Sequence, residues 1–410
     1  MERVRPIARV CDELDRRRHV ILGLGRIESL LARLGNPEND LRVVQVVGTN
    51  GKGTTAVALS VALEEAGLST GAYLSPHVLS YTERMMIHGE YVSEKEFATV
   101  MELVLETADR HGIQASQFEL LTAGALVMFR QAGVTWAVLE AGLGARYDAT
   151  TAAAPEAVVL TNVGLDHTEY LGETLRVIAL EKLASLPEGG LLVLGEENPE
   201  IVELAGERCG DAGARLVEVA PPADGPRVEN LAPYARRNAH LGVRAAEVLC
   251  GRQLEREILG RVLGRVVGVL PGRFETHELR GVPVVVDGGH NLEGLVTALA
   301  SAREVYGGRR LGVVFGVLRE KDIKSMLTAL EQQAYSLVLT RPDNERAADP
   351  GWIAESYGPR DLRGEQARVV ADPDQALDRI VEELEPLNGV VLVTGSLYTG
   401  VSILGRLRAG

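Results

Sequence analysis

Several residues suited to phosphate binding follow a short apolar run, in the stretch VVQVVGTNGKGTT that begins at Val43. Glycines let backbone N–H groups approach phosphate oxygens, and a helix that begins there offers its positive N-terminal end. Lys52 adds a point charge for the β- and γ-phosphates. The residues predicted to bind a nucleoside triphosphate are Thr49, Asn50, Gly51, Lys52, Gly53 and Thr54. The alternative is a glycine-rich turn without a ligand.

This loop departs from the commonest phosphate-loop pattern because Gly53, rather than Ser or Thr, follows the lysine. The hydroxyl groups of Thr54 and Thr55 are expected either to cap the helix that follows or to help hold Mg²⁺.

Two later apolar runs also end in groups that could do chemistry. Trp136 to Leu139 leads to Glu140, and Val158 to Val163 leads to Asp166 and His167. Ligands of open α/β sheets bind at the carboxyl ends of the strands, so these side chains are expected to face that crevice. The structural alternatives are an acid paired with an arginine for Glu140 and an ordinary loop histidine for His167.

The elements that would position these residues alternate between strand and helix. Residues 1–40 have a helical pattern that ends at Gly35-Asn36-Pro37, with apolar positions that include Val20, Ile21 and Leu24. Further predicted elements are strands at 70–74 and 191–194 and helices at 94–110, 118–131, 174–186 and 234–249.

The sequence Leu270-Pro271-Gly272-Arg273 interrupts the alternation, which then restarts. Strands are predicted at 282–286, 311–315, 335–339, 368–370 and 390–393, with helices at 292–306 and 323–332. The expected domains are therefore a larger one at 1–269 and a smaller one at 270–410, both of the α/β class with mostly parallel sheets.

Composition narrows the function classes. The 410 residues carry a formal net charge of −14, which argues against nucleic acid as a partner. Three widely spaced cysteines indicate neither a disulfide framework nor a zinc site, and no stretch resembles a signal peptide or a membrane span. A cytoplasmic monomer with small-molecule substrates is expected. A dinucleotide site is disfavoured, because Tyr147 stands where the third glycine of a GxGxxG pattern would be.

Nine stretches, in order along the chain, resemble the folylpolyglutamate synthase/dihydrofolate synthase family of the Mur ligase superfamily. They are GTNGKGTT at Gly48, YLSPHVLSYTERM at Tyr73, FELLTAGAL at Phe118, EAGLGARYDAT at Glu140, TNVGLDHTEYLGETL at Thr161, PGRFE at Pro271, DGGHN at Asp287, VFGVLREKDI at Val314 and VTGSLYT at Val393. The resemblance implies a P-loop domain of the Mur-ligase type followed by a smaller Rossmann-like domain that binds glutamate and completes the ATP site.

The resemblance also implies a reaction. A folate or dihydropteroate carboxylate would attack the γ-phosphorus of ATP to give an acyl phosphate, and the amino group of L-glutamate would then displace phosphate. Catalysis is expected to rest on Lys52, Glu140, His167 and Lys182. By similarity, Ser75, Glu140 and His167 would hold two Mg²⁺ ions.

Lys182 matches a lysine that the family carries as a carbamate. The family usually continues Ala-Gly-Ile, whereas this chain has Leu183-Ala184-Ser185, so an unmodified surface lysine is the alternative.

Other residues match by similarity alone. ATP contacts are expected at Asn238, Arg273, Asp287 and His290, with the nucleotide clamped between the domains, and pterin contacts at Ser116, Tyr147, Asp148 and Ala149. Ala145 stands for a usual glycine and Thr151 for a usual asparagine beside the pterin site. These departures leave two rivals open: a ligase of the same architecture with a non-folate acceptor, such as a cell-wall peptide precursor, and a nucleotide-binding module that has lost catalysis.

Overall fold

The computed structural model describes residues 6–222 and 232–409. The chain divides into two compact units, Met1–Pro226 with Arg237–Val266, and Arg227–Arg236 with Val267–Gly410. The division falls inside helix α9 (Pro233–Cys250) and again within helix α10 (Arg256–Val269). The domain boundary between residues 269 and 270 that the sequence indicates stays a prediction.

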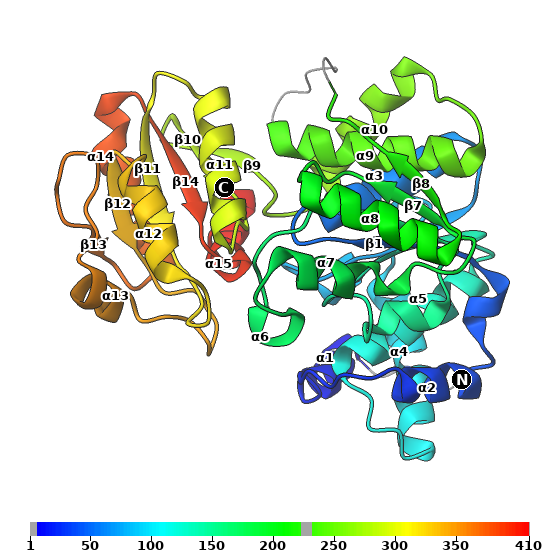
Figure 1. Ribbon diagram of the computed structural model, residues 1–410. Helices are drawn as coiled ribbons and strands as arrows, with labels where there is room; N and C mark the ends of the chain where they lie inside the picture. Colours follow the sequence, from blue (N-terminus) through cyan, green and yellow to red (C-terminus); the bar gives the residue numbers. More distant parts are fainter. Residues whose placement is uncertain (1–5, 223–231, 410) are drawn as a thin grey trace. The chain divides into compact units, whose positions relative to one another are not determined.

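The first unit contains an eight-stranded sheet with the order β4-β3-β2-β5-β1-β6-β7-β8 (Figure 1). Its strands are β1 (Arg42–Val47), β2 (Thr70–Tyr73), β3 (Met85–Ile87), β4 (Glu90–Tyr91), β5 (Trp136–Glu140), β6 (Ala157–Leu160), β7 (Leu191–Leu194) and β8 (Arg215–Glu218). All pairs are parallel except β2 with β3 and β3 with β4. In β1 the residues after Arg42 are all buried, as expected for a parallel strand that is covered on both faces.

The register of the central strands explains why the expected site residues meet. Val46 of β1 lies opposite Glu140 of β5, and Val47 lies opposite Leu160 of β6. Parallel strands end at the same edge of a sheet, so the loops that follow β1, β5 and β6 start side by side there.

The helices of this unit are α1 (Ile7–Asp15), α2 (Gly25–Arg33), α3 (Lys52–Glu65), α4 (Glu94–Arg110), α5 (Gln117–Gln131), α6 (Thr168–Leu171), α7 (Leu175–Lys182) and α8 (Pro199–Ala212), together with most of α9 and α10. The predicted helices at 94–110 and 118–131 are confirmed to within one residue at either end. The predicted helix at 174–186 ends earlier, at Lys182, and a 3₁₀ turn (Leu183–Ser185) follows it.

The expectation of continuous helical structure before residue 35 is wrong in part. Residues 1–5 lie outside the described chain, and residues 20–23 are irregular, with Val20 60% exposed and Leu22 52% exposed. Gly23 has φ +116°, a conformation that a right-handed helix does not contain. Apolar residues reach the core on either side of this irregular stretch, with Val10 and Leu14 buried in α1 and Ile27, Leu30 and Leu31 buried in α2.

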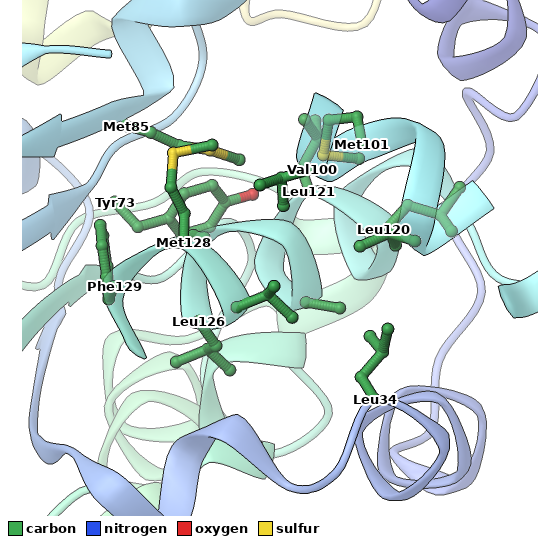
Figure 2. Close-up of a cluster of buried hydrophobic side chains, with 14 of the residues drawn as sticks. Leu34, Tyr73, Met85, Val100, Met101, Leu120, Leu121, Leu126, Met128 and Phe129 are labelled. Atoms are coloured by element: carbon green, nitrogen blue, oxygen red, sulfur yellow. The ribbon is translucent and has the colours of Figure 1, made fainter. Parts of the chain in front are cut away.

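Two hydrophobic clusters hold this unit together. The first packs α1, α2, α4 and α5 against the sheet, and Figure 2 shows a part of it in which Met85 and Met128 lie beside Tyr73. The second cluster packs α7 and α8 against β6 and β7. The strands between the two clusters carry apolar side chains on both faces, so their sequences do not alternate between apolar and polar residues.

The second unit contains a six-stranded sheet with the order β13-β12-β11-β14-β10-β9. Its strands are β9 (Glu275–Leu279), β10 (Val282–Val286), β11 (Arg310–Phe315), β12 (Ser336–Leu339), β13 (Arg368–Val369) and β14 (Gly389–Thr394), and its helices are α11 (Leu292–Val305), α12 (Ile323–Glu331), α13 (Pro350–Tyr357), α14 (Pro373–Leu384) and α15 (Leu397–Ala409). The five predicted strands are present and pair in parallel. Only β9 is antiparallel. It was not predicted because its sequence, ETHEL, has no apolar run.

Two expectations from composition can be compared with the fold. All three cysteines are free thiols, as their spacing indicates. Within residues 6–222 and 232–409, no helix combines the length and the apolar character that crossing a bilayer requires.

Helix α9 packs directly against α3, the helix that follows the phosphate loop. A Cβ atom added to Gly242 would lie 2.6 Å from the carbonyl oxygen of Thr55 and 2.8 Å from the amide nitrogen of Leu59. Both neighbours are main-chain atoms, which cannot rotate away. The glycine therefore sets the distance between the two helices.

We expect Gly242→Ala to destabilise the protein by about 1–3 kcal/mol, because the methyl group forces α9 away from α3. The matched control is Gly206→Ala in α8, where no atom lies within 4 Å of the added Cβ. The control should gain about 0.5–1 kcal/mol from its helix propensity. Thermal unfolding midpoints of both variants check this, and a Gly242→Ala midpoint at or above that of Gly206→Ala would contradict it.

Candidate active site

The phosphate loop makes two turns that only glycine can make. Gly48 has φ +148°, and a Cβ there would lie 1.8 Å from Oγ1 of Thr161. Gly51 has φ +82°, caps the N-terminus of α3, and would bring a Cβ to 2.4 Å from Nδ2 of Asn238. The first turn is thus pressed against the loop after β6, and the second against α9.

The loop after β6 holds the phosphate loop through paired hydrogen bonds. The Thr49 amide donates to the Asn162 carbonyl (3.0 Å), and the Asn50 amide donates to Oδ1 of Asn162 (2.8 Å). The Gly164 amide donates to Oγ1 of Thr49 (2.9 Å), which donates in turn to the Gly164 carbonyl (3.1 Å). The sequence singled out His167 in this stretch and missed Asn162, although Asn162 lies in the same family-matching segment.

Two lysines converge on one carbonyl oxygen of the phosphate loop. Nζ of Lys52 donates to the carbonyl oxygens of Gly48 (3.2 Å) and Thr49 (3.1 Å), and Nζ of Lys182 donates to that of Gly48 (2.8 Å). Lys182 is only 4% exposed. Burial, and then the charge of Lys52, lower the pKa of Lys182 from its ordinary value to about 7. The structure therefore confirms that Lys182 is not a surface lysine.

Glu140 lies beside the glycine that follows Lys52. The carboxylate is 4% exposed and its Oε2 accepts a hydrogen bond from the Ser75 amide (2.8 Å). A Cβ on Gly53 would stand 3.4 Å from the same oxygen, which is van der Waals contact. Glu140 and Ser75 thus lie at the start of α3.

The hydroxyl groups of the phosphate-loop helix do not cap it. Both Thr54 and Thr55 are buried within the first turns of α3, and Gly51 is the capping residue. Oγ1 of Thr55 donates to the carbonyl oxygen of Asn238 (3.1 Å), so this threonine fixes α3 to α9. The capping role expected for these residues is therefore wrong.

His167 lies in the loop that follows β6 and is exposed. It directly precedes α6 and has a left-handed backbone conformation (φ +50°). Its backbone amide donates a hydrogen bond to Oδ1 of Asp166 (3.0 Å). Among the described residues, no group of three or more His, Cys, Asp or Glu side chains is arranged to hold a metal ion.

Asp148 organises the loop that was matched to pterin binding. Its carboxylate accepts hydrogen bonds from the amides of Gly142 (2.9 Å), Leu143 (2.9 Å) and Thr150 (3.0 Å). Burial raises the pKa of Asp148 although these hydrogen bonds favour the charged form. Tyr147 beside it is 50% exposed, and Ala149 is buried. This loop therefore has a fixed backbone with one outward aromatic side chain.

The two departures in this loop are joined by a hydrogen bond. Oγ1 of Thr151 donates to the carbonyl oxygen of Ala145 (2.7 Å) and accepts from Nε2 of Gln45 (2.9 Å). Gln45 is fully buried in β1 and also donates to Thr150 (2.7 Å). The sequence offered one signal for this contact, since Gln45 is the only polar residue in its apolar run.

Ser116 has a local role in the structure. Its hydroxyl accepts from the Glu119 amide (3.3 Å) and its backbone amide donates to Oε2 of Glu119 (2.7 Å), which forms a capping box at the start of α5. Arg26 forms an ion pair with the same Glu119 (3.1 Å). The pterin contact expected at Ser116 stays a prediction.

In the second unit, the turns after α10 and after β10 carry the remaining candidates. Asp287 accepts hydrogen bonds from the amides of Phe274 (3.1 Å) and Gly289 (2.9 Å), and burial raises its pKa. Nη1 of Arg273 lies 2.8 Å from where a Cβ on Gly288 would stand, so the guanidinium lies against the Asp287 turn. Nδ1 of His290 lies 3.1 Å from the Gly288 carbonyl oxygen. Arg273, Asp287 and His290 thus come together.

A small pocket opens beside Asn238 in the first unit. It encloses about 230 Å³, open solvent at its mouth included. Its lining comprises Thr161, Gly195, Val219, Ala220, Pro221, Arg237, Asn238, His240 and Leu241. Because Thr161 and Asn238 also touch the phosphate loop, the pocket adjoins that loop.

The fold is that of Mur-type ligases. Residues 46–212 match the family described as the Mur ligase middle domain, and residues 272–397 match the Mur ligase glutamate ligase domain. These matches cover the phosphate loop in one unit and the Arg273 and Asp287 turns in the other.

Comparison with individual proteins shows which of the Mur-type ligases this chain resembles. The dihydrofolate synthase/folylpolyglutamate synthase of Bacillus subtilis is 31% identical over 418 residues, which cover 94% of this chain and 95% of that one. The structure of Escherichia coli FolC in complex with DHPP and ADP is similar with a TM-score of 0.85 at 26% identity, over 99% and 98% of the two chains. A bifunctional folylpolyglutamate synthase/dihydrofolate synthase with Mn, AMPPNP and L-glutamate bound has a TM-score of 0.84 at 29% identity, over 98% of each chain.

The chain belongs to the folylpolyglutamate synthase/dihydrofolate synthase family of the Mur ligase superfamily, whose members are ATP-dependent glutamate ligases. This confirms both the resemblance drawn from nine short stretches and the α/β fold with two mostly parallel sheets.

The lowered pKa of Lys182 predicts how stability depends on pH. Between about pH 7 and 10.5 the unfolded chain binds a proton at this lysine that the folded protein does not, so folding becomes more favourable as pH rises through that window. We expect Lys182→Met to flatten the rise in unfolding midpoint between pH 7 and pH 9. Urea unfolding in carbon-dioxide-free buffer measures this.

The control for this experiment is Lys95→Met, which removes an exposed lysine from α4. All other titrating groups are common to the three proteins and cancel in the comparison. Parallel pH curves for the wild type and Lys182→Met would contradict the prediction.

Proposed function

We propose that this protein uses ATP to join L-glutamate to the carboxylate of a folate or of dihydropteroate, with release of ADP and phosphate. The observation that carries the proposal is the convergence of Lys52, Lys182 and Glu140 around the phosphate loop. The proposal is supported by relatives of nearly equal length, one named for both activities and others solved with nucleotide, L-glutamate or DHPP, a folate analogue.

The first chemical step is transfer of a phosphoryl group to the acceptor. An oxygen of the acceptor carboxylate bonds to the γ-phosphorus while the bond to the ADP oxygen breaks. The amine of L-glutamate then bonds to the acyl carbon, phosphate leaves, and the nitrogen loses a proton. Such transfers depend on position and on charge stabilisation more than on a covalent catalyst. Loop amides, the N-terminus of α3 and the Lys52 ammonium group would supply both.

The residues at Glu140 fit a magnesium ion that binds with the nucleotide. Mg²⁺ takes one or two carboxylates and keeps several waters, so Glu140 and the Ser75 hydroxyl, with phosphate oxygens, make a plausible ligand set. Such an ion would neutralise charge on the transferring phosphoryl group. The Ser75 amide fixes the Glu140 carboxylate at 2.8 Å, which orients it for that task. A second ion at His167 rests on family resemblance.

Lys182 has the properties that carbamylation requires. A pKa of about 7 leaves much of the amine neutral near neutral pH, and only the neutral amine bonds to the carbon of CO₂. The nitrogen then loses a proton, and the product is an anion. A carbamate N–H can still donate to the Gly48 carbonyl oxygen, and the new charge would be opposite to that of Lys52.

The pocket beside Asn238 lies next to the position proposed for the nucleotide. It adjoins the loop that would hold the phosphates, and it offers both apolar walls and polar groups, as nucleotide sites do. Asn238 would then contact the nucleotide, as the family resemblance implies.

The function is tested by ADP release from the purified protein with MgATP. We expect rapid release only when L-glutamate and either dihydropteroate or a reduced folate are both present, because the amine must trap the acyl phosphate. Lys52→Ala serves as the control for contaminating ATPases and should be inactive while folded. Testing each acceptor alone shows whether one or both folate reactions are catalysed.

In the same assay, Glu140→Gln should raise the Mg²⁺ concentration needed for half-maximal rate, whereas Glu188→Gln, at an exposed position, should not. Turnover with a muramyl peptide precursor and none with any pterin would overturn the folate assignment. Near wild-type ADP release by Lys52→Ala would overturn the phosphate-loop assignment itself.

Carbamylation is tested by ¹³C NMR of the protein equilibrated with ¹³C-bicarbonate. We expect a carbamate carbon signal in the wild type that is absent from Lys182→Met, because burial lowers the pKa of Lys182 and so favours its neutral amine. Activity should fall on bicarbonate depletion and return when bicarbonate is restored. An active enzyme without this signal, and with activity indifferent to bicarbonate, would refute the modification.

A further inference from the structure

Tyr234, in the first turn of α9, belongs to the second unit and contacts Asp287 within that unit. Its hydroxyl group donates a hydrogen bond to Oδ2 of Asp287. Its ring meets the ring of Phe274 edge to face, with centroids 6.5 Å apart and planes at 83°. Tyr234 was not singled out from the sequence, because nothing in the chain around it distinguishes it from an ordinary helix residue.

Asp287 is the point at which two turns are joined. Its Oδ2 also accepts from the Phe274 amide (3.1 Å), and its Oδ1 accepts from the Gly289 amide (2.9 Å). The Gly288 amide donates across to the Gly272 carbonyl oxygen (2.9 Å). One turn carries Arg273 and the other carries His290, so the Asp287 carboxylate fixes the positions of both candidates relative to each other.

The backbone beside Arg273 is strained and needs this support. Phe274 has φ +56°, in the left-handed region that bulky residues with a side chain rarely adopt. Its amide is held by Asp287, and its buried ring is held by Tyr234. Arg273 precedes this strained residue directly, so a relaxation of Phe274 would turn the guanidinium away.

The hydroxyl of Tyr234 is suited to a permanent donor role. Burial, and then the neighbouring Asp287 carboxylate, raise the pKa of Tyr234 well above its ordinary value, so the group stays protonated. Two of the three protein donors to Asp287 are backbone amides of the turns themselves. Tyr234 is the one that comes from outside those turns.

We propose that Tyr234 is a positioning residue for the nucleotide: through Asp287 it holds the Arg273 and His290 turns in the arrangement that binds ATP. The inference rests on the proposed function, in which Arg273 and His290 contact ATP. Tyr234 itself acts through Asp287 and touches no reacting atom.

The test is Tyr234→Phe, which keeps the ring contact with Phe274 and removes only the donor. The KM for ATP and the dissociation constant for ADP should each rise roughly tenfold, as expected for the loss of a hydrogen bond to a charged group. The KM values for acceptor and L-glutamate should stay within twofold. A purely structural role would instead lower the active fraction and hence kcat, with KM for ATP unchanged.

Tyr306→Phe is the matched control, because its hydroxyl lies in the same unit, 3.5 Å from Oγ1 of Thr276, and contacts neither turn. It should bind ADP as the wild type does. In a double-mutant cycle, Tyr234→Phe should weaken ADP binding further by less than twofold once Asp287→Asn is present, since both changes break one connection.

Calorimetric measurement of ADP binding separates the positioning role of Tyr234 from the proposed ligase function, because binding can be measured without turnover. A wild type that binds ADP but shows no glutamate-dependent activity would defeat the proposed function and leave the Tyr234 inference open to the same binding test. Unchanged ADP affinity in Tyr234→Phe, or full additivity in the cycle, would overturn the inference. A Tyr234→Phe structure in which residues 272–274 keep their positions would also overturn it.

Discussion

The carbonyl oxygen of Gly48 is the point on which the site of the first unit depends. It accepts hydrogen bonds from both Lys52 and Lys182, which places two ammonium groups closer together than like charges favour. The arrangement is possible because Gly48 turns against Thr161 without a side chain. Burial and the charge of the neighbouring Lys52 make Lys182 a weaker base than an ordinary lysine. The proposed carbamate would be an anion, so the repulsion between the two lysine side chains would become an attraction.

In the second unit, hydrogen bonds to a single acceptor group also fix the backbone. The Asp287 carboxylate has the role that the Gly48 carbonyl oxygen has in the first unit, because it accepts hydrogen bonds from the amides of two turns and from the Tyr234 hydroxyl. In both units the residues expected to contact nucleotide are held by main-chain hydrogen bonds and by glycines that a Cβ would displace. Binding energy is therefore not lost in ordering these loops when a ligand arrives.

Much of the fold could be predicted from the sequence. Apolar runs located β1, β5, β10 and β14, and the helix at 94–110 was predicted because apolar spacing is a local signal. The N-terminal segment shows the limit: Val20 and Ile21 fit a helical stripe, yet they are exposed, in an irregular stretch that includes Gly23 with a non-helical φ. The edge strand β9 was missed, since polar residues at a sheet edge give no periodic signal.

The candidate site, too, was predicted in part from the sequence. Spacing within GTNGKGTT, the acid at the end of β5 and the family resemblance were sufficient to name Lys52, Glu140 and Lys182, because each belongs to a short contiguous stretch. The sequence could not show that Lys182 reaches Gly48 across 134 positions, that Gln45 supports Thr151, or that Tyr234 holds Asp287. Those contacts join segments far apart in the chain, and only the register of the strands and the packing of the helices decide which distant side chains meet.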